Sequence, residues 1–506
     1  MNTEKALIFF TRVPLPKRTK TRLLDFLTPS QTVKLHKKLI LDINEELKKL
    51  KNTQIFVFYT PEDKKEILYN LLKSEYEFYP QSGDDLAQKM LNAFKQIRSL
   101  GFKKILLIGS DIVDISAKHI SRCFDLLAQN NAVITPTFDG GYCLLGLQDV
   151  NIKNMYDIFS SNYSVRNTVY YGICSKFVEL GIKTCKTKAL RDIDTKEDIF
   201  AYILGVKTVK HLASGEYNIN YKFKKSGENF VFRINTKSQI GLKNQIKYEY
   251  DALKILEISD VTPKPIRYFP PNLFLPRGAM SMQFLPGRPL RYDSDLDIAS
   301  SMLAKIHSVK IPPKHSFIIA QRPLQVMMDE CEKMSSIYLN SNFKKQNVSE
   351  FLQALIKVLK WFNLDREIKD PCIINTELNS GNFLINEGKK SYIIDWEKPI
   401  IGEKEQDLAH FLAPTTTFWK TDVILDLEEM QNFLDKYERI LPVDRAKFNE
   451  YLGMTFLRGL SWCAMAYVEY QGSRAIKNQT TYKKINEYLS DKFLSILHSK
   501  FLKDIL

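Results

Sequence analysis

The first 205 residues alternate short apolar runs with amphipathic segments. The runs are ALIFF, QIFVFY, KILLIG and AVITP, which begin at Ala6, Gln54, Lys104 and Ala132. Uninterrupted apolar runs of this length are typical of strands buried on both faces. Residues 84–101 favour a helix that ends near Gly101 and whose apolar stripe consists of Leu86, Met90, Phe94 and Ile97. The alternation predicts an α/β domain at residues 1–205 with a mostly parallel, Rossmann-like sheet.

The pattern changes at about residue 206. Residues 228–235, ENFVFRIN, alternate apolar and polar positions, which favours a strand with one exposed face. A proline-rich stretch at 261–276 then separates a strand-rich part from a helix-rich part. We therefore predict a two-lobed α+β domain at 206–506, with an N-lobe of about 206–285 and a C-lobe of about 286–506.

Composition narrows the function classes. The chain has 44% apolar and 26% charged residues, and no apolar run is long enough to span a bilayer, so we expect no integral membrane segment. Seven cysteines without a CxxC pair favour a cytoplasmic protein without disulfides or zinc. The net charge of +15 is spread among lysines interleaved with glutamates, which favours small anionic substrates over nucleic acid. The sequence is compatible with a homo-oligomer.

A basic loop follows the first predicted strand. Its cations are Arg12, Lys17, Arg18, Lys20 and Arg22, and it also contains Pro14 and Pro16. Ligands of open parallel sheets bind beyond the carboxyl ends of the strands, so this loop suits a triphosphate or a nucleotide sugar. The alternative is a solvated run of charges.

Carboxylates follow two later segments of the same half. Asp111 comes after a fully apolar run, and Asp192 and Asp194 lie in LRDIDTKEDI. Two carboxylates that meet at a strand edge hold Mg²⁺ against phosphate oxygens, and we assign Asp111 and Asp194 to this role. The alternative for Asp194 or Thr195 is the cap of a helix that begins at Lys196.

Five motifs of the N-terminal half occur in a recognisable order. They are FTRVPLPKRTKTRL, SGDDLAQKMLNAF, IGSDIVDIS, PTFDGGYCLLGL and LRDIDTKEDI. This half resembles the MobA-like, GT-A-fold transferases, which are often described as arsenosugar-type glycosyltransferases. The resemblance implies a nucleotide-binding loop at Lys17, Lys20 and Arg22 and a metal carboxylate at Asp111. We assign Lys20 and Arg22 to catalysis, and Lys17 and, from the charge of the loop, Arg12 to nucleotide binding. The resemblance also implies an acceptor turn formed by Asp139, Gly140, Gly141 and Tyr142.

The resemblance leaves two details open. Lys17 replaces a glycine that commonly follows the second proline of the loop. Transfer of a glycosyl group from a nucleotide sugar and transfer of a nucleotidyl group from an NTP both need a basic loop and carboxylate-held Mg²⁺. These residues therefore do not separate the two reactions.

The C-terminal half carries a second set of motifs. They are Gly215 with Asn218, FVFRIN, Glu249, TPKPI, FLPGRPL, LAKIHS, CIINTELNSGNFLI and IIDWEKP. This half resembles the aminoglycoside phosphotransferase and choline kinase family. The resemblance implies Mg-ATP, with Gly215, Asn218, Arg233 and Glu249 on the nucleotide, Glu377 as base, Asn382 and Asp395 on the metal, and Asp407 supporting the loop. The alternative for Arg233 and Glu249 is an ordinary surface ion pair.

The base position is substituted. The family usually has His and Asp where this chain has Asn375 and Glu377. Glu adds about 1.5 Å of reach, and phosphoryl transfer depends mainly on positioning and charge stabilisation, so we predict an active kinase. The alternative is a silent kinase-like module. His410 and Trp419 either line a substrate pocket or pack in the core, and His307 is expected to be a packed histidine.

These patterns predict a bifunctional transferase that acts on small molecules. The C-terminal half would phosphorylate a small alcohol, an amino alcohol or a sugar, with Mg-ATP. The N-terminal half would transfer a nucleotidyl group to a phosphorylated substrate. The alternative for the N-terminal half is glycosyl transfer from a nucleotide sugar. In that case the C-terminal half is an active kinase or a regulatory pseudokinase.

Overall fold

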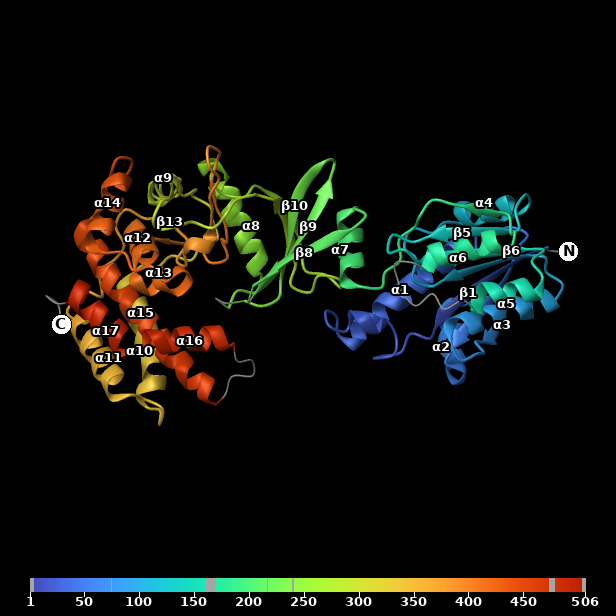
Figure 1. Cartoon of the computed structure of the whole chain (residues 1–506), viewed down its shortest axis with the longest axis horizontal. Helices are drawn as coiled ribbons and strands as arrows, with labels where there is room; N and C mark the ends of the chain where they lie inside the picture. Colours follow the sequence, from blue (N-terminus) through green and yellow to red (C-terminus); the bar gives the residue numbers. More distant parts are fainter. Residues whose placement is uncertain are drawn as a thin grey trace. The chain divides into compact units, whose positions relative to one another are not determined.

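The protein is described by a computed structural model that covers residues 4–73, 75–160, 169–215, 217–238, 241–472 and 478–502. It divides into two compact units, shown from blue to red along the chain in Figure 1. One unit is Met1–Lys210 with Phe223–Gly227, and the other is His211–Lys222 with Glu228–Leu506. Among the described residues, no helix combines the length and apolarity that a membrane crossing requires.

The N-terminal unit is built on a seven-stranded sheet, counted over the described residues. Its strands are β1 (Lys5–Arg12), β2 (Gln54–Thr60), β3 (Glu77–Pro80), β4 (Lys104–Gly109), β5 (Ala132–Pro136), β6 (Tyr142–Gln148) and β7 (Thr184–Lys186), in the order β3-β2-β1-β4-β6-β5-β7. All neighbours pair in parallel except β6, which is antiparallel to β4 and to β5. The short turn between β5 and β6 forces this exception, because parallel neighbours need a long crossover. The predicted mostly parallel sheet is confirmed.

Helices cover both faces of this sheet. Leu7 and Phe9 of β1 face the cluster formed with α1 (Pro29–Leu47), α2 (Lys65–Leu72) and α4 (Ala117–Leu127). Ile8 and Phe10 face the cluster formed with α3 (Leu86–Ser99), α5 (Ile152–Ser160) and α6 (Val169–Glu179). The unit is therefore a three-layer α/β sandwich, and α7 (Lys196–Leu204) follows its last strand in the chain.

The stripe predicted for α3 is largely correct. Met90, Phe94 and Ile97 are buried, and Gly101 has the left-handed φ of 95° that ends the helix. Leu86 was wrongly included, because it is 64% exposed. It is the first residue of α3, and the buried residues of the helix begin one turn later.

The strand-rich part of the C-terminal unit is a five-stranded sheet. Its strands are β8 (Val209–Ser214), β9 (Asn218–Lys225), β10 (Glu228–Asn235), β11 (Pro265–Phe269) and β12 (Ala279–Gln283), in the order β11-β12-β10-β9-β8. Helix α8 (Gln245–Leu256) packs against β10, β11 and β12. Because β10 is central, residues 231–235 are buried on both faces, so the prediction of one exposed face holds only for residues 228–230.

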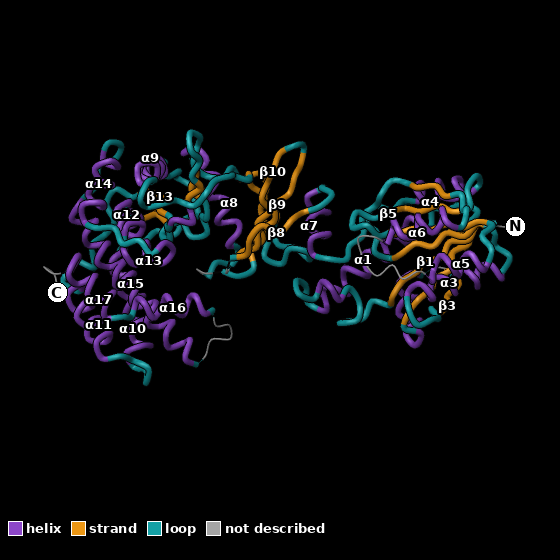
Figure 2. Tube along the Cα trace, in the orientation of Figure 1, coloured by secondary structure: helices purple, strands orange, loops and turns teal. Residues whose placement is uncertain are grey.

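The remaining residues are mostly helical, as Figure 2 shows. The helices are α9 (Leu296–His307), α10 (Pro323–Leu339), α11 (Gln346–Leu359), α12 (Lys404–Leu412), α13 (Pro414–Thr421), α14 (Leu427–Glu438), α15 (Arg445–Gln471), α16 (Gln479–Tyr488) and α17 (Asp491–Leu497). Two short strand pairs lie among them, β13 (Cys372–Ile374) with β16 (Ile400–Gly402) and β14 (Phe383–Leu384) with β15 (Tyr392–Ile393). The predicted α+β fold, with a strand-rich part followed by a helix-rich part, is confirmed.

A buried ion cluster holds the start of α12. The Glu403 carboxylate, 0% exposed, accepts hydrogen bonds from Arg366 Nη1 at 2.8 Å, Lys447 Nζ at 2.7 Å and Tyr451 Oη at 2.6 Å. Burial alone would raise the pKa of Glu403, but the hydrogen bonds from Lys447 and Tyr451 lower it to about 2. The carboxylate is therefore a stabilising anion at neutral pH.

We predict that Glu403→Gln destabilises this unit by about 3 kcal/mol at pH 7, the value of a pKa lowered from its ordinary range to about 2. The contribution is complete above pH 4.5 and is lost as pH falls towards 2, so the difference from the wild type should shrink on acidification. Urea unfolding followed by tryptophan fluorescence measures it, because Trp361, Trp396, Trp419 and Trp462 all lie in this unit. The exposed Glu428→Gln is the control. Equal midpoints for the two variants would refute the prediction.

Candidate active sites

In the N-terminal unit, two acidic segments meet at the carboxyl edge of the sheet. Asp111 lies two residues beyond β4, and the segment Arg191–Ile193 runs antiparallel beside it. The Ile193 amide donates to Asp111 O at 2.9 Å, and the Val113 amide donates to Arg191 O at 3.0 Å. This pairing brings Asp194, which follows directly, close to Asp111.

Lys20 connects these two carboxylates. Its Nζ lies 2.6 Å from Asp111 Oδ1 and 3.5 Å from Asp194 Oδ1, and it also donates to Ile193 O. Arg22 Nη1 lies 3.0 Å from Asp194 Oδ2. The structure therefore gathers four of the predicted side chains, Lys20, Arg22, Asp111 and Asp194, at one place.

Asp194 does not cap α7. The Asp198 carboxylate accepts from the backbone amides of Asp194 and Thr195, at 3.1 and 2.7 Å, so Thr195 is the N-cap residue. This leaves the side chain of Asp194 to face Lys20 and Arg22.

His36 is a site residue that the sequence did not reveal. Its Nδ1 is hydrogen-bonded to Thr19 Oγ1, and its Nε2 lies 3.1 Å from Ser110 Oγ. Burial lowers the pKa of His36 to about 4, so the ring is neutral at pH 7. It ties the basic loop to the residue before Asp111. Its only sequence signal was a place on the apolar stripe of α1, which is more typical of core packing.

Two aspartates of this edge differ in charge. Burial would raise the pKa of Asp111, but the ammonium of Lys20 holds it below its usual range. Burial, and after it the carboxylates of Asp139 and Asp194, raise the pKa of Asp192 to about 7. Asp111 is therefore charged at neutral pH, whereas Asp192 exchanges a proton near pH 7.

The other predicted residues of the loop lie on its exposed side. Arg12 ends β1, and its charge helps to lower the pKa of Asp111. Lys17 has a left-handed φ of 60°, the conformation that a glycine adopts without strain, which explains the glycine expected there. Among the described residues, Lys17 has no ion-pair partner, so the structure does not join it to the cluster around Lys20.

The predicted acceptor turn connects β5 to β6. Asp139 Oδ1 accepts from Thr137 Oγ1 at 2.5 Å and from the Gly141 amide at 3.0 Å. Gly140 has a φ of 89°, which favours glycine, and a Cβ on Gly141 would lie tightly against Thr137 Oγ1, at 3.0 Å. Tyr142 begins β6 and contacts Met90 of α3. The turn lies at the same sheet edge as Asp111.

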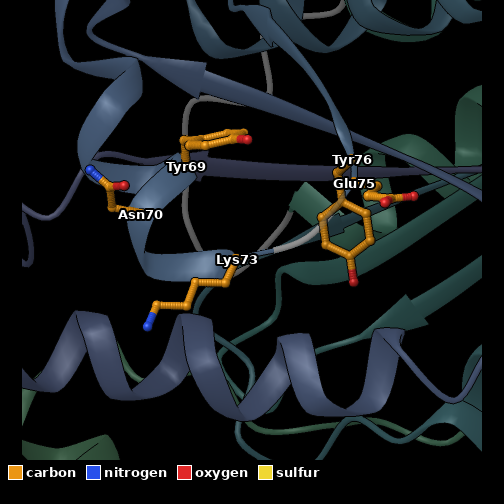
Figure 3. A pocket seen from close by; sticks show the side chains of 5 residues that line it. All are labelled: Tyr69, Asn70, Lys73, Glu75 and Tyr76. Carbon is orange, nitrogen blue, oxygen red and sulfur yellow. The ribbon is translucent and has the colours of Figure 1, made fainter.

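A hollow of about 570 Å³ lies away from this edge. Figure 3 shows the side chains that line it, which are Tyr69, Asn70, Lys73, Glu75 and Tyr76. They surround the end of α2 and the start of β3, which is the amino end of the parallel strands. None of the predicted site residues lines it, so we assign the chemistry to the carboxyl edge.

In the C-terminal unit, Arg233 is the centre of the candidate site. Its Nε lies 3.0 Å from Glu249 Oε2, and its Nη2 lies 2.8 Å from Asp395 Oδ1 and 2.5 Å from Glu397 Oε1. The Arg233 side chain is only 7% exposed, so this is not an ordinary surface ion pair. Glu397 was not predicted from the sequence, although it lies two residues after the predicted metal ligand.

Charge is unbalanced around Arg233. Burial alone would lower its pKa, but Glu249, Asp395 and Glu397 raise it, so the guanidinium stays charged. Burial raises the pKa of Glu249 to about 8, with Glu397 and Asp395 adding to the effect and Arg233 opposing it. One cation thus faces three carboxyl groups, an arrangement that favours a further cation.

A strand pair positions the two predicted metal ligands. Asn382 precedes β14 and Asp395 lies two residues after β15, and the Ile394 amide donates to Asn382 O at 2.7 Å. Asp395 has a left-handed φ of 67°, and its side chain is 44% exposed. Asn382 Oδ1 accepts from the Asn379 amide at 2.9 Å, which leaves the carbonyl one lone pair.

Asp407 anchors the loop that carries the predicted base, Glu377. The buried carboxylate of Asp407 accepts from the amides of Asn375 and Thr376, both at 2.7 Å, and lies 3.4 Å from His307 Nε2. His307 is buried, as predicted for a packed histidine. The Glu377 carboxylate pairs with the ammonium of Lys398, whose side chain is 9% exposed.

The structure gives less support to the predicted phosphate loop at Gly215 and Asn218. A Cβ on Gly215 would meet only Asn218 O, at 3.7 Å, and the φ of Gly215 is not positive, so the backbone does not require glycine there. Asn218 is buried, and within the described chain its Nδ2 makes no hydrogen bond of good geometry. Burial raises the pKa of Glu397, which a hydrogen bond from Asn218 nevertheless helps to lower, so this amide faces the carboxyl groups around Arg233.

The helix that packs against the catalytic loop carries an aromatic side chain. Helix α13 packs against the short helix η5 (Ser380–Asn382). Trp419 of α13 meets Trp462 edge to face, with ring centroids 5.3 Å apart, and both side chains are half-buried. Burial lowers the pKa of His410 to about 3, with the charge of Arg458 adding to the effect, so this ring is neutral.

In the described part of the chain, no three Cys, His, Asp or Glu side chains form a complete metal site. Mg²⁺ is usually held by one or two carboxylates while phosphate oxygens and water complete the shell. The predicted ligand pairs, Asp111 with Asp194 and Asp395 with Asn382, carry oxygen atoms of this kind.

Comparisons with known proteins divide the chain in the same way. Residues 43–162 match the family described as "uncharacterized protein conserved in bacteria (DUF2064)", and residues 208–445 match the phosphotransferase enzyme family. A 2-phospho-L-lactate guanylyltransferase of Methanocaldococcus infernus is 29% identical over 222 residues, which is 42% of this chain and 94% of that protein.

Solved structures resemble each half. A proposed nucleotide-diphospho-sugar transferase of Desulfovibrio desulfuricans is 25% identical and covers 40% of this chain and 86% of its own, with a TM-score of 0.37. A choline kinase of Streptococcus pneumoniae is 20% identical and covers 59% of this chain and 98% of its own, with a TM-score of 0.42. The two family matches and the guanylyltransferase relative together support a transferase whose two halves are similar to two different families.

Proposed function

We propose that the protein is a bifunctional transferase. Its C-terminal domain phosphorylates a small alcohol with Mg-ATP, and its N-terminal domain transfers a nucleotidyl group to a phosphorylated substrate. The observation that carries the proposal is the buried arginine that joins three carboxyl groups at the kinase site. The domain order suggests that the product of the first reaction is the substrate of the second.

The charges of the C-terminal site suit a metal nucleotide. Even with Glu249 mostly protonated at pH 7, as its pKa of about 8 implies, Arg233 and Lys398 face three further carboxyl groups, those of Glu377, Asp395 and Glu397. Asp395 and Asn382 would hold Mg²⁺, which when bound neutralises the phosphate oxygens of ATP. Arg233 would bind the phosphates, with Asn218 beside it. Family membership itself implies ATP.

Glu377 would act as the base. Its carboxylate takes the proton of the substrate hydroxyl while the oxygen bonds to the γ-phosphorus and the bond to ADP breaks. Lys398 orients this carboxylate, so the longer Glu side chain is held in one place. We infer that Glu377 and Lys398 together replace the usual Asp.

The alcohol is best matched by an amino alcohol. Trp419 lies on α13, the helix that packs against η5 of the catalytic loop, and its half-buried ring meets that of Trp462. Aromatic faces bind organic cations, so these rings would attract an ammonium group while the hydroxyl lies near Glu377. The choline kinase resemblance is consistent with such a substrate.

The N-terminal site suits transfer of a nucleotidyl group. Asp111 and Asp194 would hold Mg²⁺, and Arg12, Lys20 and Arg22 would neutralise the triphosphate. An acceptor phosphate at the Asp139–Tyr142 turn attacks the α-phosphorus, and pyrophosphate leaves. By its name, the guanylyltransferase relative performs this class of reaction on a phosphorylated acid, which favours nucleotidyl over glycosyl transfer.

For the kinase, Glu377→Gln should lower kcat by about 10²- to 10⁴-fold, the usual contribution of a general base. Formation of ADP from ATP with a panel of amino alcohols and sugars measures it. Glu387→Gln is the matched control, because Glu387 is 87% exposed and undergoes the same chemical change. ADP formation that Glu377→Gln leaves intact would exclude Glu377 as base, and a wild type inactive on every alcohol would favour a silent module.

The pairing of Glu377 with Lys398 predicts non-additive effects. Lys398→Met should lower kcat because the carboxylate loses its anchor, whereas the double variant Glu377→Gln, Lys398→Met should be no slower than Glu377→Gln alone. A double-mutant cycle on kcat measures the coupling. Independent, multiplicative losses would show that Lys398 does not act through Glu377.

For the N-terminal domain, incubation with NTPs and phosphorylated alcohols or acids should release pyrophosphate. Asp111→Asn should reduce this release by at least about 100-fold, because the metal ligand and the partner of Lys20 are lost together. Asp114→Asn, an exposed change three residues away, should keep the activity. Release of a nucleoside diphosphate from UDP- or GDP-sugars instead of pyrophosphate would show glycosyl transfer.

A further inference from the structure

The ammonium of Lys20 occupies a position that resembles a cation site. Three oxygens surround its Nζ: Asp111 Oδ1, Asp194 Oδ1 and the backbone carbonyl of Ile193. The side chain is only 5% exposed. Oxygen groups of these types, two carboxylates and a carbonyl, are those that bind divalent ions.

The loop holds Lys20 in this position from two sides. Lys20 has a left-handed backbone, with φ 48° and ψ 45°, and precedes the short helix η1 (Thr21–Leu23). Its neighbour Thr19 is 1% exposed and hydrogen-bonded to the buried His36 ring. A lysine in a sparsely populated conformation persists only where its surroundings determine it.

A lysine and a divalent ion cannot share this position. Placed within a few ångströms of each other, the ammonium and the divalent ion would repel. Together they carry three positive charges, whereas the two carboxylates carry two negative charges. A metal ion can therefore enter only when the ammonium moves to another anion. The phosphates of a nucleotide are such an anion.

We propose that Lys20 keeps divalent ions out of the nucleotide-free site, so that metal and nucleotide enter together. This rests on the proposed function only in taking Asp111 and Asp194 as the metal ligands. Arrival of the nucleotide phosphates draws the Lys20 ammonium away from Asp111, and the released carboxylates then accept the metal. Lys20 thus has two anionic partners, one in each state.

The test is binding of Mn²⁺ to the full-length protein without nucleotide, measured by electron paramagnetic resonance. All samples carry Asp395→Asn, which weakens binding at the C-terminal site. Lys20→Met should bind Mn²⁺ at least about tenfold more tightly than the parent, because a positive charge next to the ion is removed. Addition of GTP to the parent, which keeps Lys20, should produce tight Mn²⁺ binding.

A matched lysine controls for net charge. Lys196→Met removes the same charge two residues from Asp194, but the Lys196 ammonium pairs with Asp25, 2.7 Å away, and should leave Mn²⁺ affinity unchanged. Adding Asp111→Asn to Lys20→Met should abolish the gain, which would place the ion at the carboxylate pair. If Lys20→Met does not fold, as judged by circular dichroism, Lys20→Gln is measured in its place.

Two results would overturn the proposal. One is equal Mn²⁺ affinity of the parent and the Lys20 variant, and the other is an equal gain in Lys196→Met. Pyrophosphate release by the wild type is scored separately. A gain of Mn²⁺ binding without any nucleotidyl transfer would uphold the role of Lys20 and reject the assigned reaction, whereas transfer without a gain would do the reverse.

Discussion

Each candidate site of this protein is organised by one buried cation among carboxyl groups. Lys20 joins Asp111 to Asp194 in the N-terminal domain, and Arg233 joins Glu249 to Asp395 and Glu397 in the C-terminal domain. Buried carboxylates that lack a partner are costly, so the cation is what allows several of them to gather in one place. The same negative charge that the cation controls is what suits each site to a metal-bound phosphate.

Arg233 and Lys20 differ in how they pair with the carboxyl groups around them. Arg233 presents a planar fork and binds several carboxylates at fixed angles, so it suits a site that stays assembled. Lys20 presents a single ammonium on a flexible stem and can change partner with one side-chain movement. The N-terminal arrangement therefore lends itself to exchange between protein carboxylates and ligand phosphates.

The substituted base of the kinase domain has a structural counterpart. Asp407 holds the loop through the amides of Asn375 and Thr376, so the loop does not depend on the residue at the base position. Lys398 then fixes the carboxylate of Glu377. A longer acid paired with its own lysine is the arrangement that the proposed role of Glu377 as base requires.

The amino-acid pattern by itself determined the strands, the change from one type of domain pattern to another at about residue 206, and the acidic and basic residues that follow the strands. It did so because burial on both faces, turn chemistry and charge are properties of short segments. Tertiary structure alone decided that β6 runs antiparallel, that Leu86 is exposed and β10 is buried, and that His36, Glu397 and Lys398 belong to the sites. A residue such as His36 looks like core packing in its own helix, and its role depends on which distant loop it touches. Periodicity reports that a side chain is buried, but its partner is set by long-range pairing that no local pattern contains.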